Sequence, residues 1–330
     1  MKEKILRLLS DGDDYVSGQE ICERLGVSRT AVWKTINKLK EDGYGIEAVP
    51  NRGYRITYRP DRISPAEITA RMETKRLGRD VRCFESVDST NRVAKRLGEE
   101  GAAEGTLVVA DEQTAGKGRS GRRWVTPKGS TIAMSLLLRP KIAPERISMV
   151  TLVMGMAVAL AVRECTGAEA LIKWPNDVVL SGKKICGILT EMSAEMNTEM
   201  AIVHYIVIGT GININLKEFP EEIRQTATSL QIELGAEVER AAIIAAVMKH
   251  FERLYEQYIS TADLSLLLDG YNALLVNRGR RVQVLDPAGS YTGQALAIDA
   301  LGRLLVETED GSVRKVFAGE VSVRGIYGYV

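Results

Sequence analysis

QTAGKGRSGRRW, residues 113–124, is a glycine-rich and cationic segment in the first half of the chain. It holds three glycines and four Lys or Arg residues, and it has no acidic residue. The glycines match the G-x-G-x-x-G spacing of dinucleotide-binding folds, but that motif requires glycines that follow a strand directly and open a helix. Here residues 111–115 separate them from the strand predicted at 106–110, and Pro127 and Gly129 prevent a following helix. We therefore predict a mobile loop that surrounds a polyanion with backbone N–H groups and cationic side chains.

The composition is that of an ordinary soluble globular protein. The chain has 330 residues, 45% hydrophobic and 26% charged, with a net charge of +1, so it can form two or three domains and gives no global nucleic-acid signal. The longest apolar run, Met149 to Val162, is too short to span a bilayer and predicts a buried helix. Four scattered cysteines and the lack of a secretory signal predict a cytoplasmic protein without a membrane partner. Two histidines make a His-based metal site or a Ser-His-Asp triad improbable.

The first sixty residues have the pattern of a winged helix-turn-helix. Ser17 and Ser28 are placed to cap two short helices that a glycine turn separates. Two extended runs around a polar turn at 51–53 predict a β-hairpin wing. Residues 1–62 carry 12 Lys or Arg against 10 Asp or Glu, whereas the stretch 28–40 has four basic residues and no acidic one. This charge favours DNA binding over the alternative, a small helical domain with a solvated basic face.

The predicted DNA contacts come from the second of these helices and from the wing. The first three face base edges and the others suit phosphate contacts: Ser28, Arg29, Thr30, Lys34, Lys38, Arg52 and Arg55. The stretch RPDRISPAE, residues 59–67, contains two prolines among polar residues and is predicted to be a linker.

Three further stretches predict parts of the same site as the loop. Asp88-Ser89-Thr90-Asn91 opens a predicted helix, where hydroxyl, amide and free N–H groups can meet a polar ligand. Residues 173–177, KWPND, interrupt an apolar strand. The fold gains nothing obvious from this interruption. Lys184 lies on a predicted short strand and points either into a cleft or to solvent. Each piece alone is more simply a cap or a turn, but together they predict a site.

The rest of the chain has two clear patterns. Apolar residues recur at helical spacing from Ile243 to Tyr258 and predict a long amphipathic helix. From about Leu275, short alternating runs separated by turn residues predict a small antiparallel barrel.

These motifs resemble those of the biotin–protein ligases, specifically the bifunctional form that is also a biotin-operon repressor. GKGRSGRRW at 116–124 matches the family loop except for Lys117, where arginine is usual, and the motifs at 88–91, 173–177, 184–189 and 209–213 follow in family order. The resemblance covers essentially the whole chain. It implies a multidomain α+β protein: a winged helix at 1–62, a mixed α/β ligase domain with an antiparallel-type sheet at 63–273, and an SH3-like β-barrel at 274–330. The glycine-rich run 317–325 resembles the terminal strand of that barrel, with a role in ATP or acceptor binding and a purely structural role both open.

The resemblance also implies a two-step reaction. The biotin carboxylate attacks the α-phosphate of ATP to give biotinyl-5′-AMP and pyrophosphate, and a lysine of a carboxylase biotin-carrier domain then displaces AMP. Biotin-operon DNA and, with biotinyl-AMP as corepressor, a second copy of the chain are the other implied partners. No protein nucleophile is needed, because the substrate carboxylate attacks, and the site must supply cations and N–H donors.

Residue roles follow from the resemblance position by position. The implied biotin contacts are Ser89, Thr90, Asn91, Gln113, Lys117, Gly118, Arg119 and Lys184. The implied nucleotide contacts are Trp124, which would stack on adenine, Arg122, Asn176 and Asn213. The implied catalytic residues are Lys184, Arg119 and Asp177. Mg²⁺ would be held mainly by the phosphates, with Asn176 and Asp177 as candidate protein contacts.

Lys117 keeps the charge of the family arginine but loses its planar fork. We therefore expect catalysis to survive and retention of the adenylate to be the property affected. Two alternatives stay open at this point: a transcription factor whose ligand domain only senses a small molecule, and a lipoate–protein ligase with the related fold.

Overall fold

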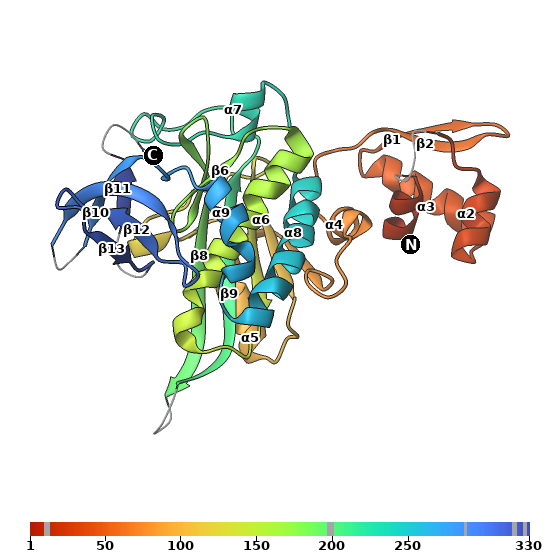
Figure 1. The fold of residues 1–330 in the computed structure, drawn as a ribbon. Coiled ribbons are helices and arrows are strands. Elements are labelled where there is room, and N and C mark those ends of the chain that lie inside the picture. The colour runs from red at the N-terminus through yellow and green to blue at the C-terminus, as the bar shows by residue number, and fades with distance from the viewer. Residues whose placement is uncertain (10–13, 197–200, 287–288, 319–321, 326–328) are drawn as a thin grey trace.

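The computed structural model describes residues 1–9, 14–196, 201–286, 289–318, 322–325 and 329–330. Figure 1 shows an N-terminal unit and a C-terminal sheet on opposite sides of a central domain. This arrangement confirms the predicted fold class: a winged helix, a central domain with a mixed sheet and a small C-terminal antiparallel sheet.

The N-terminal unit is a winged helix-turn-helix. Its elements are α1 (Lys2–Leu8), α2 (Gly18–Leu25), α3 (Arg29–Glu41), β1 (Gly45–Val49) and β2 (Gly53–Tyr58). The Ser17 and Ser28 hydroxyls accept hydrogen bonds from backbone N–H groups in the first turns of α2 and α3, as predicted. Gly26 ends α2 with φ of 63°, a conformation that glycine adopts without strain.

Helix α4 (Pro65–Arg71) joins the cores of the N-terminal and central units. Ile68 is fully buried in the central core, whereas Ala70 is buried in the N-terminal core. The last three residues of the stretch 59–67 belong to this packed helix, so the prediction of a linker was wrong for them.

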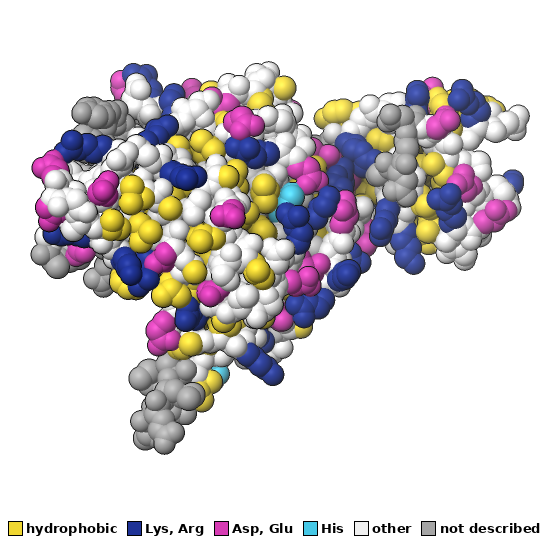
Figure 2. All heavy atoms as spheres, viewed as in Figure 1, with side chains coloured by type: hydrophobic (Ala, Val, Ile, Leu, Met, Phe, Trp, Pro, Cys, Tyr) yellow, Lys and Arg dark blue, Asp and Glu magenta, His cyan; other side chains and the backbone are white. Residues whose placement is uncertain are grey.

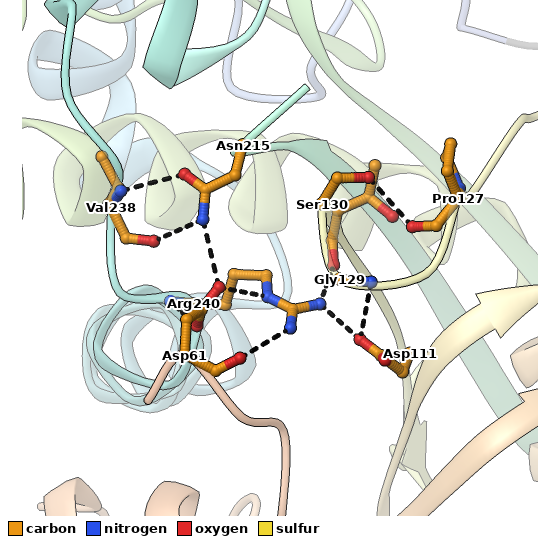
Figure 3. Close-up of polar contacts among 9 residues, drawn as sticks. Asp61, Asp111, Pro127, Gly129, Ser130, Asn215, Val238 and Arg240 are labelled. Atoms are coloured by element: carbon orange, nitrogen blue, oxygen red, sulfur yellow. Dashed lines mark hydrogen bonds and ion pairs between the residues drawn. The ribbon is translucent and has the colours of Figure 1, made fainter. Parts of the chain in front are cut away.

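A buried arginine fixes the segment that leads into α4. Arg240, the first residue of α8 (Arg240–Thr261), is 2% exposed. Its guanidinium donates to the carboxylate of Asp61 at 2.7 Å, to the backbone carbonyl of Asp61 at 3.1 Å and to the carboxylate of Asp111 at 2.6 Å (Figure 3). Asn215 also donates to the Asp61 carboxylate, at 3.1 Å. The segment between the N-terminal unit and α4 is therefore hydrogen-bonded to the central domain.

The central domain is built on a seven-stranded mixed sheet of order β3-β4-β5-β9-β8-β7-β6. Only the β3–β4 pair is parallel among the described strands. The strands are β3 (Val81–Val87), β4 (Leu107–Gln113), β5 (Thr131–Leu138), β6 (Leu171–Lys173), β7 (Asp177–Leu180), β8 (Lys183–Met196) and β9 (Ala201–Asn213). The shorter helical segments are α7 (Leu230–Leu234), α9 (Leu268–Leu274), η1 (Arg119–Gly121), η2 (Pro144–Arg146) and η3 (Ser265–Leu267).

Helices cover both faces of this sheet. Successive side chains of a strand point to opposite faces, and apolar side chains on both faces need to be buried. Leu107 and Val109 of β4 enter the main core with α6 (Ser148–Thr166) and α8. Val108 between them packs in a separate cluster with α5 (Thr90–Glu99). The long amphipathic helix predicted around Ile243 to Tyr258 is α8, and its apolar face is buried as expected.

The apolar run at 149–162 forms most of α6. A segment at Pro144–Thr166 is long and apolar enough to cross a membrane by composition, but 72% of its most apolar window is buried inside the protein. It therefore belongs to the core, which confirms the prediction of a buried helix.

The C-terminal unit is a five-stranded antiparallel sheet of order β13-β12-β11-β10-β14. Its strands are β10 (Arg281–Leu285), β11 (Tyr291–Ile298), β12 (Leu304–Glu307), β13 (Val313–Val316) and β14 (Ser322–Gly325). Val282, Val284 and Leu304 are fully buried in the same core as α6. Part of the predicted run 317–325, at 319–321, lies outside the described residues.

Candidate functional site

The glycine loop is a compact hairpin between β4 and β5. Strand β4 continues to Gln113, three residues beyond its predicted end, and one three-residue 3₁₀ turn follows before β5. The Trp124 N–H donates to the Gly116 carbonyl at 2.9 Å, and the Gly118 N–H donates to the Arg122 carbonyl at 2.7 Å. A Cβ on Gly116 would lie 2.5 Å from the Trp124 carbonyl oxygen, so glycine is required there. No dinucleotide-type helix follows, in line with the sequence argument.

Arg119 ties this loop to two other parts of the chain. It donates to the side-chain oxygen of Asn176 at 2.9 Å and to the backbone carbonyl of Ala318 at 3.1 Å. The loop, the KWPND hairpin and the C-terminal unit therefore meet at one guanidinium.

A small polar cavity of about 130 Å³ lies between the start of α5, the end of β4 and the middle of β8 and β9. The Thr90 N–H and hydroxyl both donate to the Gln113 side-chain oxygen, at 2.9 and 3.1 Å. Asn91 donates to Glu191 at 2.7 Å and accepts from the Ser135 hydroxyl at 2.6 Å. The structure thus brings together Ser89, Thr90, Asn91, Gln113, Lys117, Gly118, Arg119 and Lys184, all of which line this cavity.

Two glycines of β9 explain the G-x-G-I-N motif. A Cβ on Gly209 would lie 2.2 Å from the side-chain oxygen of Asn91. A Cβ on Gly211 would lie 2.4 Å from the Trp124 indole, and one on the facing Gly187 of β8 would make a less severe but still tight contact with that ring, at 3.2 Å. Bare backbone at these positions makes room for the Asn91 amide and for a flat aromatic ring.

A second, larger cavity of about 1420 Å³ adjoins the first. The two cavities share Gly118, Arg119, Trp124, Asn176 and Lys184. Among the predicted nucleotide contacts, Arg122 and Asn213 also line the larger cavity, together with Arg123, Lys173 and Lys217. The buried Trp124 indole N–H has no hydrogen-bond partner among the described residues, so it is a donor that a ligand can use.

Lys184 points into the cleft, which answers the question that the sequence left open. Its ammonium donates to Oδ1 of Asp177 at 2.5 Å and lies 5.6 Å from the Trp124 ring centroid. Its strand is not short, because β8 runs for 14 residues. The Lys184 and Asp177 side chains are only 25% and 14% exposed, so their attraction is screened less than that of a surface pair.

The KWPND stretch forms the turn between β6 and β7, and the fold does gain from it. Trp174 is 1% exposed. Its indole N–H donates to the Gly302 carbonyl at 3.0 Å, and its backbone N–H donates to the Asn277 side chain at 2.9 Å. Trp174 therefore holds the C-terminal unit against the central domain through these hydrogen bonds. The interpretation that the interruption serves only a site was wrong for this residue.

Sequence reasoning missed several residues of the small cavity. Lys95 pairs with Glu191 at 2.5 Å, and Glu191 lies directly beside Asn91. Ser135 lies behind the cavity, where its buried hydroxyl is 2.8 Å from the Thr90 hydroxyl and 2.6 Å from the Asn91 side-chain oxygen. The only local signal was the position of Lys95 one helical turn after Asn91.

The predicted DNA contacts lie on α3 and the wing. Ser28, Arg29, Thr30, Lys34 and Lys38 are all exposed. Figure 2 shows Lys and Arg side chains spread over the N-terminal unit among Asp and Glu, in keeping with its small net charge.

The wing arginines have partners within the unit. Arg55 donates to Glu47 at 2.8 Å, and the Arg52 and Arg55 guanidiniums lie 4.4 and 4.8 Å from the centroid of the Tyr15 ring. Trp33, which the sequence argument did not select, is 57% exposed on the same helix as Lys34.

Fold and site together define a class: a winged helix joined to a mixed α/β domain in which a cationic glycine loop lines two adjoining cavities. Family models match three consecutive parts of the chain. They are an HTH domain at residues 2–55, the Biotin/lipoate A/B protein ligase family at 83–213 and the Biotin protein ligase C terminal domain at 279–324.

Individual proteins similar to this chain identify the class more closely. The bifunctional ligase/repressor BirA of Bacillus subtilis is 38% identical over 98% of this chain and 98% of the relative. The biotin–[acetyl-CoA-carboxylase] ligase of Mycobacterium tuberculosis is 34% identical over 66% of this chain and 79% of the relative. A solved structure of the biotin protein ligase from Aquifex aeolicus in complex with biotin and ATP matches with a TM-score of 0.65 and 31% identity, over 74% of this chain and 99% of that chain. The chain belongs to the family of bifunctional biotin–protein ligases and repressors.

Proposed function

We propose that the small cavity holds biotin and the large cavity holds ATP, so that biotinyl-5′-AMP forms where the two cavities meet. Family membership makes the chain a biotin–protein ligase and a DNA-binding repressor. The observation that carries the cavity assignment is the pair of adjoining cavities that share Lys184 and Arg119. A compact, hydrogen-bonding pocket suits a small polar ring system, and a large cavity with several Lys and Arg residues suits a nucleotide triphosphate.

Hydrogen bonding in the small cavity supports the biotin contacts. Thr90 and Gln113 orient each other and Glu191 orients Asn91, so a ureido group would meet donors and acceptors that need little rearrangement. Lys117, Gly118 and Arg119 of the loop would cover the biotin carboxylate.

Charge at the junction supports the chemical step. An oxygen of the biotin carboxylate attacks the α-phosphorus, the bond from that phosphorus to the bridging oxygen breaks, and pyrophosphate leaves. Both reactants are anions, so the Lys184 and Arg119 cations lower the barrier by offsetting charge that builds up in the transition state. Trp124 lies on the boundary with an unused N–H donor and a flat face, which suits adenine stacking.

The transfer step requires an acceptor lysine. Its amine attacks the acyl carbon of the adenylate, AMP leaves, and the proton of the amine passes to solvent. A relative that matches this chain is named for an acetyl-CoA-carboxylase substrate, so we propose a carboxylase biotin-carrier domain as the acceptor.

Mg²⁺ fits this site mainly through the phosphates. No cluster of three or more His, Cys, Asp or Glu side chains that could hold a metal occurs among the described residues. The side-chain oxygen of Asn176 accepts from Arg119, and both oxygens of Asp177 accept hydrogen bonds. Asn176 and Asp177 would therefore add at most one or two oxygens, and the ion supplies charge neutralisation of the triphosphate.

The function is tested by mass spectrometry of a biotin-carrier domain after incubation with this chain, biotin, ATP and Mg²⁺. We expect the domain to gain the mass of one biotinyl group, and a parallel incubation with lipoate to leave it unmodified. A domain that stays unmodified with biotin while pyrophosphate is not released would contradict the proposal.

Gly209→Ala is expected to raise the KM for biotin by about tenfold or more, because a methyl 2.2 Å from the Asn91 oxygen must displace that amide. Gly155→Ala is the matched control, since its Cβ would meet neighbours at 3.7 Å, an ordinary contact. Pyrophosphate release at varied biotin concentration measures the effect. An unchanged KM for biotin in the Gly209 variant would show that Asn91 does not contact biotin.

We also propose that the adenylate controls the repressor activity through the loop at 116–123. Contacts between this hairpin and biotinyl-AMP would rigidify it and complete a surface for a second copy of the chain. Amide exchange of the loop is expected to slow with saturating adenylate, and unchanged exchange would argue against this link.

The four cysteines are free thiols, which supports a reducing, cytoplasmic location.

Lys38→Ala is expected to reduce the magnitude of the salt slope of DNA affinity by about one, because an exposed lysine of α3 would contact one phosphate. Fluorescence anisotropy on a duplex DNA over a range of salt concentrations measures the slope. Lys141→Ala, an exposed lysine of the central domain, is the control and should leave the slope unchanged. Equal slopes for wild type and the Lys38 variant would remove Lys38 from the DNA interface.

A further inference from the structure

Tyr329 enters the ligation site from the C-terminal unit. Its hydroxyl donates a hydrogen bond of 2.5 Å to Oδ2 of Asp177, whose Oδ1 accepts from the Lys184 ammonium. The Lys173 ammonium lies 3.4 Å from the centroid of the Tyr329 ring. Tyr329 therefore contacts both charged residues of the KWPND hairpin, and it lines the large cavity.

Other atoms of the C-terminal unit lie at the same place. Val330 packs beside the turn between β7 and β8, because a Cβ on Gly182 would lie 3.6 Å from its side chain. Ala318 accepts a hydrogen bond from Arg119, and Val323 lines the large cavity. The contact of Tyr329 is thus part of a wider seam between the C-terminal unit and the site.

We propose that Tyr329 is a positioning residue for adenylation: it holds the Asp177 carboxylate in the orientation that keeps the Lys184 ammonium at the junction of the two cavities. The proposal rests on the role proposed above for Lys184.

The hydrogen-bond pattern explains why a hydroxyl is needed there. With Tyr329 on one oxygen and Lys184 on the other, the orientation of the Asp177 carboxylate is fixed from both sides. Without the hydroxyl, the carboxylate can turn both oxygens toward Lys184 and draw the ammonium away from the substrate anions. Burial and the nearby charge of Asp177 raise the pKa of Tyr329, so its hydroxyl stays protonated and remains a donor at neutral pH.

The ring and the hydroxyl have separable roles. The ring alone satisfies packing and the contact with Lys173. Tyr329→Phe keeps the ring and removes only the donor to Asp177, so it isolates the positioning role. Tyr291→Phe removes a hydroxyl from the same unit outside both cavities and is the matched control.

The test is steady-state pyrophosphate release by the full chain with biotin, ATP and Mg²⁺, accompanied by thermal unfolding. We expect Tyr329→Phe to lower kcat by about tenfold, while the KM values for biotin and ATP change by less than about twofold and Tm stays close to wild type. Tyr291→Phe should behave as wild type.

Two results would overturn the proposal. One is a wild-type kcat in Tyr329→Phe. The other is a loss of kcat that Tyr291→Phe reproduces, or that is accompanied by a Tm low enough to unfold the variant at the assay temperature. A wild-type chain that releases no pyrophosphate would instead contradict the proposed function itself, so the two failures are distinguishable.

Discussion

Lys184→Ala is expected to slow pyrophosphate release by about 100- to 1000-fold, the range for removal of a cation or donor that meets developing charge. Loss of the ammonium removes the partner of Oδ1 of Asp177, which is 2.5 Å away in the wild type. The carboxylate would then add its own repulsion to that between the biotin carboxylate and the triphosphate. The effect should appear mainly in kcat, because the cation acts most strongly on the transition state.

Lys183→Ala is the matched control for this experiment. Lys183 is the preceding residue of β8 and lines neither of the two cavities. Its variant should retain nearly full activity. If the two lysine variants lose the same activity, or Lys184→Ala loses none, Lys184 does not act at the reacting atoms.

Arg240→Ala is expected to lower the free energy of unfolding by about 3 to 5 kcal/mol, because it leaves two partly buried carboxylates without their counter-ion. The Asp61 and Asp111 side chains are 23% and 19% exposed, and Arg240 is 2% exposed. Urea or guanidinium unfolding of the full chain, followed by tryptophan fluorescence, measures the change.

Arg224→Ala gives the comparison for a solvated pair. Arg224 is 58% exposed and pairs only with the 80% exposed Glu221 among the described salt bridges, so its loss should cost less than about 1 kcal/mol. A loss for Arg240→Ala no greater than that for Arg224→Ala would show that the buried network adds little to stability.

Local signals explain what the sequence predicted correctly. Serine caps, a glycine C-cap and apolar spacing act within one or two turns of a helix, so the helix-turn-helix and α8 could be placed from the residues alone. The glycine loop was rejected as a dinucleotide turn on equally local grounds, the residues on either side of it. The 88–91 motif was placed correctly at a helix start for the same reason.

Contacts between distant residues explain what it did not predict. Ser135 and Asn91 are 44 residues apart, and Asn91 and Glu191 are 100 apart, so their hydrogen bonds exist only after β5, β8 and β9 have paired. Trp174 was assigned to a site because its partners, Asn277 and Gly302, lie more than a hundred residues away. Tyr329 gave no local signal at all, since its contact with Asp177 spans 152 residues.

The Asp61–Arg240 pair bears on where this chain can be divided. A ligase fragment that starts after residue 62 would keep Arg240 but lose Asp61, one of its two carboxylate partners. Such a fragment would be less stable than the full chain. A cut just after β2, which ends at Tyr58, would leave the Asp61–Arg240 ion pair and helix α4 in the ligase fragment. The N-terminal piece would still lose Ala70 from its core, so each half retains something the other needs.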